Sequence, residues 1–243
     1  MASKAQLPNT NQGLRSDYFD RKYKEFKEGC DAGSPHACFA LGEWYQLLGK
    51  DLAKAKQVYE TNCAIREDPN SCFNLANLVL HHQELELGQE AKAKFGHGRD
   101  AAARTMLSLA CSSGQHSQAC SVLATLVLSG RGGEQDTARG MALLESLCEA
   151  PVNDARSCVR IGGALLRPSF GLKRDPARAF RFVQRGCDEL GHPNACQILS
   201  VMYAKGDGVT QDSAKALHYR TKTAELVNAT GEKLGTDVVA PPQ

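Results

Sequence analysis

Ten cysteines are the residues of this 243-residue chain whose types and spacing could do chemistry. They fall into five close pairs, with seven to nine residues between partners. Closely spaced thiols of this kind can form disulfides, or they can bind a metal ion as thiolates. The five pairs are Cys30/Cys38, Cys63/Cys72, Cys111/Cys120, Cys148/Cys158 and Cys187/Cys196.

Zinc is the alternative to disulfides, because three of the pairs enclose a histidine. His36, His116 and His192 each lie between two cysteines, whereas the other two pairs contain no histidine. A structural zinc ion needs four ligands, and each of these loops offers three, with no fourth ligand at a repeated position. The spacing therefore favours five structural disulfides over zinc, and we expect the three histidines to be polar residues at helix junctions.

The second cysteine of each pair opens a predicted helix in which the same residue types recur. Alanine or serine precedes it, leucine or isoleucine follows three residues later, and tyrosine, valine or leucine follows seven residues later. With a small residue at the fourth position, this is the stripe of an amphipathic helix of about three turns. The small column should let this helix pack closely on its neighbour. Its members are Gly42, Ala76, Ala124, Gly162 and Ser200.

Five aspartates open a second type of helix in the same repeat. An aspartate at the N-cap accepts hydrogen bonds from unpaired amide groups, and its charge suits the positive end of a helix. Four of the five are followed, 11 or 12 residues later, by the first cysteine of the next pair, which is about three helical turns. Each cysteine pair should therefore join the end of one helix to the beginning of the next. The five are Asp51, Asp100, Asp136, Asp175 and Asp212.

The repeating unit is thus a helical hairpin. The aspartates are spaced 36 to 39 residues apart, with one spacing of 49. A two-helix repeat of this length predicts an all-α fold, an α-solenoid of about five helix-turn-helix repeats and about 11 helices, stapled by disulfides. We expect a polar N-terminal extension over residues 1–16, a repeat solenoid over 17–230 with an insertion at about 81–98, and an extended C-terminal tail over 231–243.

Composition and charge indicate which classes of partner the chain lacks the features to bind. The net charge is +2, and Lys and Arg are scattered among acidic neighbours, so we expect no nucleic-acid partner. No stretch approaches the roughly 20 apolar residues of a membrane span, which predicts no transmembrane segment. The segment from Met1 to Ser16 is polar and lacks the apolar core of a secretory signal peptide and the arginine-rich character of a matrix presequence.

No catalytic constellation is recognisable in the sequence. There is no nucleophile, base and orienting group in one pattern, and no C-x-x-C motif or unpaired cysteine. The adjacent His81 and His82 would point about 100° apart on a helix, so both cannot face one iron. We expect Trp44 to pack between repeats; the alternative is that it is exposed and contacts a partner. The sequence thus predicts no enzyme, no catalytic residue and no metal site.

Several motifs resemble a known repeat family. Leu41-Gly42-Glu43-Trp44-Tyr45 in the first helix, Gly206-Asp207-Gly208-Val209 in a loop and the helix from Asp212 to Ala216 look like Sel1-like repeats. The cysteine pairs resemble the cysteine-rich subgroup, which has a secreted bacterial branch and a branch of mitochondrial cytochrome c oxidase assembly factors. The segment from Cys187 to Cys196 and the Met202-Tyr203 pair resemble the mitochondrial branch.

The resemblance implies a function and a compartment. An oxidised protein without a secretory signal fits the mitochondrial intermembrane space, which oxidative import machinery fills by trapping close cysteine pairs. The implied function is a non-enzymatic scaffold serving respiratory-chain proteins, complex IV or a supercomplex, as an assembly factor or a bound accessory subunit. The family resemblance also makes haem a possible cofactor. Two alternatives stay open: a secreted bacterial repeat protein, and a haem-binding or thiol–disulfide redox protein.

Overall fold

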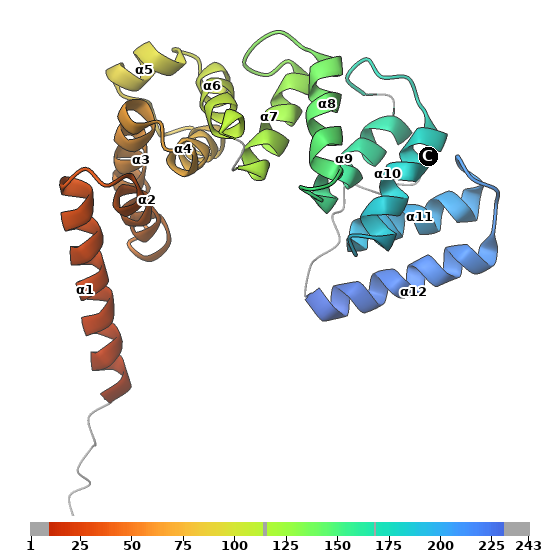
Figure 1. Cartoon of the computed structure of the whole chain (residues 1–243), viewed down its shortest axis with the longest axis horizontal. Helices are drawn as coiled ribbons and strands as arrows, with labels where there is room; N and C mark the ends of the chain where they lie inside the picture. Colours follow the sequence, from red (N-terminus) through yellow and green to blue (C-terminus); the bar gives the residue numbers. More distant parts are fainter. Residues whose placement is uncertain (1–9, 114–115, 168, 231–243) are drawn as a thin grey trace, which may run out of the picture. The chain divides into compact units, whose positions relative to one another are not determined.

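A computed structural model describes residues 10–113, 116–167 and 169–230, with side chains described from residue 17 to 229. These residues form twelve α-helices and one π-helical turn, and none of them lies in a strand (Figure 1). The elements are α1 (Thr10–Asp31), α2 (Pro35–Glu43), η1 (Trp44–Leu48), α3 (Leu52–Arg66), α4 (Pro69–His81), α5 (Gln89–Phe95), α6 (Arg99–Ser112), α7 (Ser117–Ser129), α8 (Thr137–Cys148), α9 (Ala155–Leu166), α10 (Pro176–Asp188), α11 (Pro193–Lys205) and α12 (Ser213–Thr230).

The predicted all-α repeat fold is confirmed. After α1, the five hairpin repeats correspond to α2/α3, α4/α6, α7/α8, α9/α10 and α11/α12, which gives the expected eleven helices. The additional helix, α5, lies within the insertion expected between residues 81 and 98. Residues 1–9 of the expected extension and the expected tail at 231–243 lie outside the described residues, whereas α1 already begins at Thr10.

The chain divides into two compact units, residues 1–110 and 111–243. In the first unit, α1 packs on α2, α2 on α3, and α3 on both α4 and the inserted α5. The insertion buries Leu87, Ala91 and Phe95, each less than one tenth exposed. Lys94 anchors it to α3, because its Nζ donates to the Ala64 carbonyl oxygen at 2.6 Å. The insertion is therefore an integral part of this unit.

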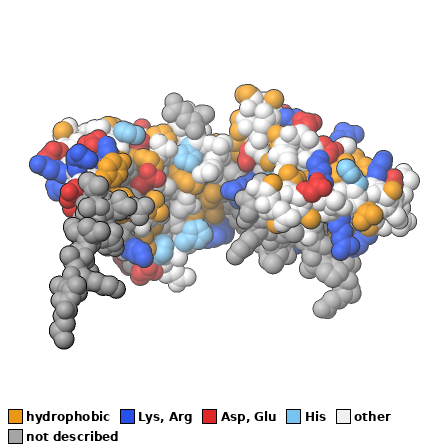
Figure 2. All heavy atoms as spheres, turned by 90° about the horizontal axis from the view of Figure 1, so that it is seen from below, with side chains coloured by type: hydrophobic (Ala, Val, Ile, Leu, Met, Phe, Trp, Pro, Cys, Tyr) orange, Lys and Arg blue, Asp and Glu red, His pale blue; other side chains and the backbone are white. Residues whose placement is uncertain are grey.

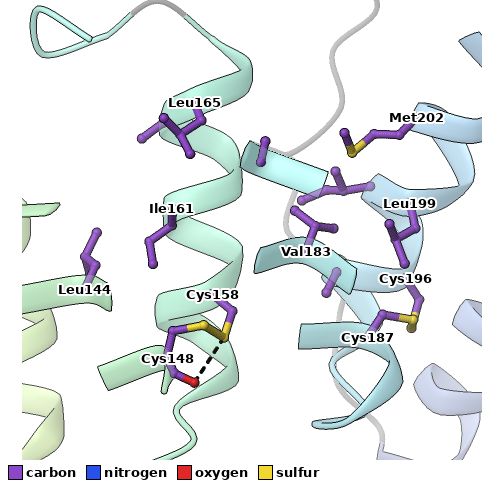
Figure 3. Close-up of a cluster of buried hydrophobic side chains, with 14 of the residues drawn as sticks. Leu144, Cys148, Cys158, Ile161, Leu165, Val183, Cys187, Cys196, Leu199 and Met202 are labelled. Carbon is purple, nitrogen blue, oxygen red and sulfur yellow. Dashed lines mark hydrogen bonds between the residues drawn. A yellow bond between two sulfur atoms is a disulfide. The ribbon is translucent and has the colours of Figure 1, made fainter. Parts of the chain in front are cut away.

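In the second unit, the helices from α7 to α12 pack in succession, and α9 also contacts α11. A continuous apolar core runs between them. Figure 3 shows its side chains converging between the helices, with two disulfides at one end of the cluster. Burial of this core, at about 25 cal/mol per Å² of apolar surface, is the main term that holds the hairpins together. Its central members are Leu144, Ile161, Leu165, Val183, Leu199 and Met202.

In the repeats α2/α3, α9/α10 and α11/α12, the small column of the first helix meets the second helix, as expected. A Cβ atom on Gly42 would lie 2.3 Å from the ring of Tyr59, and one on Gly162 would lie 2.2 Å from Cγ2 of Val183. Ser200 instead donates its hydroxyl to the Ala216 carbonyl oxygen at 2.8 Å. The two helices of a hairpin approach so closely because these positions carry almost no side chain.

The second helix starts at the predicted aspartate in four of the five repeats and at a different residue in the fifth. Four aspartate N-caps are present, each accepting a backbone N–H three residues later at 2.9 or 3.0 Å; they are Asp51, Asp136, Asp175 and Asp212. The prediction of Asp100 as the fifth cap is wrong, because Asp100 is the second residue of α6, which begins at Arg99.

The predicted start of the first helix is also wrong, and the error concerns the second cysteine of every pair. The sequence predicts that this cysteine opens the helix, but the helix begins three residues earlier, so that the cysteine is its fourth residue. The correction applies to Cys38 in α2, Cys72 in α4, Cys120 in α7, Cys158 in α9 and Cys196 in α11.

Residues just before each of these cysteines explain the earlier start. The Asp68 and Asp154 carboxylates accept N–H bonds in the first turns of α4 and α9. Proline occupies the first position of α2, α4 and α11, where it has no N–H to leave unpaired. In α7 a histidine side chain, that of His116, caps the helix. The second cysteine therefore lies at the end of the first helical turn rather than at the first residue of the helix.

None of the described helices is long and apolar enough to span a lipid bilayer.

Candidate protein-interaction surface

The ten cysteines form five disulfides, each of which joins one helix to the next along the chain. In every pair, a cysteine at the end of one helix is bonded to the fourth residue of the following helix. The Cα atoms of the partners lie within the range that disulfide geometry requires. The separations are 4.4 Å for Cys30–Cys38, 4.8 Å for Cys63–Cys72, 4.7 Å for Cys111–Cys120, 4.9 Å for Cys148–Cys158 and 4.8 Å for Cys187–Cys196.

The environment of the sulfur atoms is that of structural bonds rather than reactive thiols. Most of the cysteines are buried, including Cys38, Cys72 and Cys158, whereas Cys120 is half-buried. The Sγ atoms of Cys38, Cys120 and Cys158 lie 3.6, 3.5 and 3.7 Å from the carbonyl oxygens of their own partners. These approaches are packing contacts, because a sulfur atom in a disulfide carries no hydrogen to donate. No cysteine is free to ligate zinc as a thiolate.

Close packing of small residues brings the partner cysteines together. At the first and last junctions, the residue before the first cysteine faces the residue before the second. A Cβ atom on Gly29 would lie 2.7 Å from that of Ala37, and one on Gly186 would lie 3.1 Å from that of Ala195. The sequence shows alanine or serine before each second cysteine, but it does not reveal what those residues contact.

The junction between α3 and α4 is closed by hydrogen bonds instead. Asn62, which precedes Cys63, is fully buried. Its amide Nδ2 donates to the hydroxyl of Ser71, the residue before Cys72, at 2.7 Å and to the Pro35 carbonyl oxygen at 3.0 Å. A buried donor without a partner is costly, so these two bonds stabilise the Asn62 amide group at this junction.

The histidines between the cysteine pairs lie at helix starts, as expected. His116 is the N-cap of α7, and its Nδ1 accepts the Ala119 N–H at 3.2 Å. His192 occupies the residue before α11 and is buried, whereas His36 is exposed in the first turn of α2. Within the described part of the chain, no three His, Cys, Asp or Glu residues cluster as a metal site would require.

The adjacent histidines do not form a haem site. His81 is the last residue of α4, while His82 has left the helix, and its Nδ1 lies 3.2 Å from Oε1 of Glu84. Nothing in this arrangement presents two imidazoles to one iron atom.

Trp44 belongs to an aromatic cluster in the first unit. Its ring centroid lies 4.6 Å from that of Tyr23 and 5.7 Å from that of Tyr45, so Trp44 packs on α1 rather than between two repeats. The Tyr23 and Tyr45 hydroxyls are 3.0 Å apart. Burial raises the pKa of Tyr45 to about 12, and this hydrogen bond adds to the effect. The cluster fixes α1 on the first repeat.

A groove in the second unit is large enough to hold a ligand side chain or peptide segment. It has a volume of about 480 Å³ and is bounded by α7, α8, α9, α11 and the segment after α9. Its floor and walls are mainly apolar, and no carboxylate of the described residues lines it. The apolar lining includes Leu128, Leu144, Val159, Leu166, Phe170 and Ile198.

Arginine supplies the charge in this groove. Nη1 of Arg160 donates to the Ser121 carbonyl oxygen and hydroxyl, both at 2.8 Å, and to the Thr125 hydroxyl at 3.1 Å. Desolvation of the guanidinium lowers the pKa of Arg160. Its side chain is fixed against α7, although part of it remains exposed to solvent.

Arg160 is part of a longer row on α9. Arg156 and Gly163 lie four and three residues from it, which places all three on one side of the helix, and Arg167, the first residue after α9, also lines the groove. A Cβ atom on Gly163 would meet no heavy atom within 4 Å, so the row faces open space. Sequence reasoning missed these arginines, because their spacing does not show which of them lack an acidic partner.

One face of the molecule carries charges of both signs. On the face shown in Figure 2, Lys and Arg side chains are interspersed with Asp and Glu side chains. Such a distribution lacks the continuous basic stripe that a nucleic-acid backbone would require.

Successive helical hairpins cross-linked at their junctions define an α-solenoid, a class of repeat protein in which each unit packs on its neighbours. A family model for the Sel1 repeat matches residues 35–57, 117–151, 155–189 and 193–228, which together make up more than half of the chain. The chain therefore belongs to the Sel1 repeat family.

Curated relatives match almost the whole chain. Cytochrome c oxidase assembly factor 7 of Xenopus tropicalis is 26% identical over 220 residues, covering 89% of this chain and 90% of the relative. The cytochrome c oxidase assembly factor 7 homolog of Drosophila melanogaster is 25% identical over 244 residues, covering 86% and 88%.

Solved structures support the fold. A Sel1 repeat protein from Oxalobacter formigenes superposes with a TM-score of 0.66 at 21% identity, covering 89% of this chain and 85% of its own. A protective antigen of uropathogenic Escherichia coli gives 0.65 at 19% identity, covering 91% of this chain and 49% of its own. At these identities the likeness concerns architecture alone.

Proposed function

We propose that this chain is a non-enzymatic interaction scaffold of the mitochondrial intermembrane space that assists the assembly of cytochrome c oxidase. One observation carries the proposal: the match to proteins named cytochrome c oxidase assembly factor 7 extends over 89% of this chain and 90% of the relative from Xenopus tropicalis. A match of that extent includes the repeats of both units rather than a single hairpin.

The chemistry of the chain supports binding rather than catalysis. All ten cysteines are used in disulfides, so none is a low-pKa thiol of the kind that redox enzymes employ. Repeated hairpins instead offer an extended surface on which a partner can be held. The structural disulfides cross-link the junctions between helices.

The disulfides also support the proposed compartment. Disulfides persist where the surroundings are oxidising, and they are rare where glutathione keeps thiols reduced. The partners of each pair are separated by only 8 to 10 positions in sequence. Pairs this close can be oxidised soon after a chain crosses a membrane, which is how the intermembrane space retains imported proteins. The oxidative import machinery is therefore a proposed partner, alongside respiratory-chain proteins.

The test is a native gel of mildly solubilised mitochondria, probed for this chain and for cytochrome c oxidase, before and after depletion of the chain. Loss of mature oxidase on depletion, with the chain migrating as a small species or with oxidase precursors, is expected of an assembly factor. Co-migration with mature oxidase or a supercomplex at comparable abundance would make it an accessory subunit instead.

Two results would reject the proposal. Unchanged oxidase after depletion would remove the assembly function. A chain absent from mitochondria would favour the secreted alternative. Alkylation of intact mitochondria tests the compartment separately: we expect no reactive thiols in the chain, and ten would place it in reducing surroundings.

A further inference from the structure

We propose that the groove beside α9 binds a partner-protein segment in which an Asp or Glu carboxylate is flanked by bulky apolar side chains. The carboxylate would pair with Arg160, and the apolar side chains would occupy the groove between α9 and its neighbours. This inference rests on the proposed scaffold function and specifies which surface of the chain the partner contacts.

The first argument is the state of the Arg160 guanidinium. A guanidinium carries five N–H donors in a planar fork. The hydrogen bonds to Ser121 and Thr125 all involve Nη1, and neither Nε nor Nη2 bonds any described residue. Two parallel N–H groups are what a carboxylate accepts in a bidentate pair. Because Nη1 already fixes the side chain, less conformational entropy is lost when a carboxylate binds.

The second argument is uncompensated charge. Three nearby arginines of the second unit have acidic partners: Arg174 pairs with Asp207, Arg178 with Glu145 and Arg185 with Glu189. By contrast, no carboxylate of the described residues pairs with an arginine of the α9 row, namely Arg156, Arg160 or Arg167. The groove therefore carries a positive potential that favours an acidic ligand.

The nearest acidic group on α9 does not cancel this charge. Asp154 attracts Arg160 at a distance and opposes the fall in the pKa of Arg160 that desolvation causes. Its carboxylate is already engaged, because it accepts the Ser157 N–H at 3.1 Å and the Ser157 hydroxyl at 2.5 Å. Asp154 is thus committed to capping α9 rather than to neutralising the row.

The third argument is the apolar surface beside the charge. Leu128 and Ile198 are 3% exposed and form a firm floor, while Val159, Leu166 and Phe170 are partly buried. The space above Gly163 is open, one helical turn after Arg160. A free anion would gain nothing from this lining, whereas an apolar side chain next to a carboxylate would be removed from water there.

The experiment selects ligands from a phage-displayed library of random 16-residue peptides on the full-length oxidised chain. The dissociation constants of the enriched peptides are then measured by fluorescence polarisation. We expect the enriched peptides to carry Asp or Glu within a few residues of Leu, Ile or Phe.

Three variants test the site. Arg160→Gln should raise the dissociation constants of these peptides by at least about tenfold, since a hydrogen bond to a charged group is lost. Arg160→Lys, which keeps the charge but loses the planar fork, should recover only part of the affinity. Gly163→Leu should abolish binding by filling the open space. Arg181→Gln is the matched control, because Arg181 is an exposed arginine of α10 outside the groove. Circular dichroism and thermal melting must show each variant folded.

Several outcomes would overturn the inference. They are failure to enrich any peptide, enrichment without acidic residues, and affinities that Arg160→Gln and Arg181→Gln change equally. Tighter peptide binding by a chain ending at Thr230 would identify the C-terminal tail as the occupant. Arg160-dependent binding of anionic phospholipid vesicles, without peptide binding, would identify a membrane surface.

This test is independent of the oxidase test. Peptides that depend on Arg160, in a chain whose depletion leaves oxidase unchanged, would preserve the groove and reject the proposed function. A chain required for oxidase that selects no acidic peptides would do the reverse.

Discussion

Two adjacent glycines of α9 should respond in opposite ways to the same substitution. A Cβ atom on Gly162 would lie 2.2 Å from Cγ2 of Val183, which is fully buried. Ordinary carbon–carbon contacts are about 3.5 to 4 Å, so α9 and α10 must separate by roughly 1 Å or more, or Val183 must leave its rotamer. Overpacking of this kind costs up to about 3 kcal/mol, and the better helix propensity of alanine offsets about 1 kcal/mol. We therefore expect Gly162→Ala to lower the free energy of unfolding by about 2 kcal/mol.

Gly163→Ala is the internal control. The added methyl group meets nothing within 4 Å, so only the helix-propensity term remains. The free energy of unfolding should rise by about 1 kcal/mol. The two variants should thus differ by about 3 kcal/mol, although each adds one methyl group to the same helix.

Urea denaturation followed by far-ultraviolet circular dichroism measures this difference, with the disulfides intact. The slope of free energy against urea concentration should stay the same, so that the midpoints alone report stability. Equal midpoints for the two variants, or a stabilised Gly162→Ala chain, would refute the close approach of α9 and α10 at this position.

Three further perturbations have defined outcomes. Replacing Cys187 and Cys196 together by alanine should lower the free energy of unfolding by about 2–3 kcal/mol, because a short loop in the unfolded chain is no longer closed; urea titration in the absence of reductant measures it. Asn62→Ala should cost about 1–3 kcal/mol, since the buried Ser71 hydroxyl loses its donor, and the same titration compared with the exposed Asn228→Ala tests this. Burial, followed by a hydrogen bond to an aspartate, raises the pKa of Tyr219 to about 12. Folding thus stabilises the neutral phenol, a contribution present below pH ~10 and lost as pH rises through about 12; an alkaline melt should be less steep in Tyr219→Phe, and an unchanged profile would contradict the assignment.

The sequence predicted the hairpins well because their signals are local and repeated. The residue at Gly42 or Gly162 must be small because two helices touch there, so the column is visible without coordinates. The aspartate caps were readable for the same reason. The prediction of Asp100 as an N-cap was wrong because α6 begins one residue earlier, and an acidic residue is also favourable inside the first turn.

The start of the first helix was harder to place, because its caps differ from one repeat to the next. Aspartate precedes α4 and α9, serine precedes α2 and histidine precedes α7 and α11. An alignment on the invariant cysteine, such as Cys38 or Cys158, therefore placed the helix start at the one residue that every repeat shares. The physical start is a backbone hydrogen-bonding requirement that several residue types can meet.

The groove could not be predicted, because it depends on which side chains are left uncovered after packing. Arg160 reads in the sequence as an ordinary surface arginine, as does Arg178. Only the structure shows that Arg178 has an acidic partner while Arg160 has hydroxyl and carbonyl partners on α7. The apolar lining comes from four different helices and the segment after α9, and no single periodicity includes them.

The local pairing of the disulfides has a consequence for the order in which the chain acquires its bonds. Every native partner is also the nearest cysteine along the chain, 8 to 10 positions away. An unfolded segment of about 10 residues closes on itself in about 10–100 ns, far faster than distant segments meet. Native pairs therefore encounter one another most often even before any helix is packed. Each disulfide of this chain can therefore form independently of the others, and few wrong pairs need to be reshuffled afterwards.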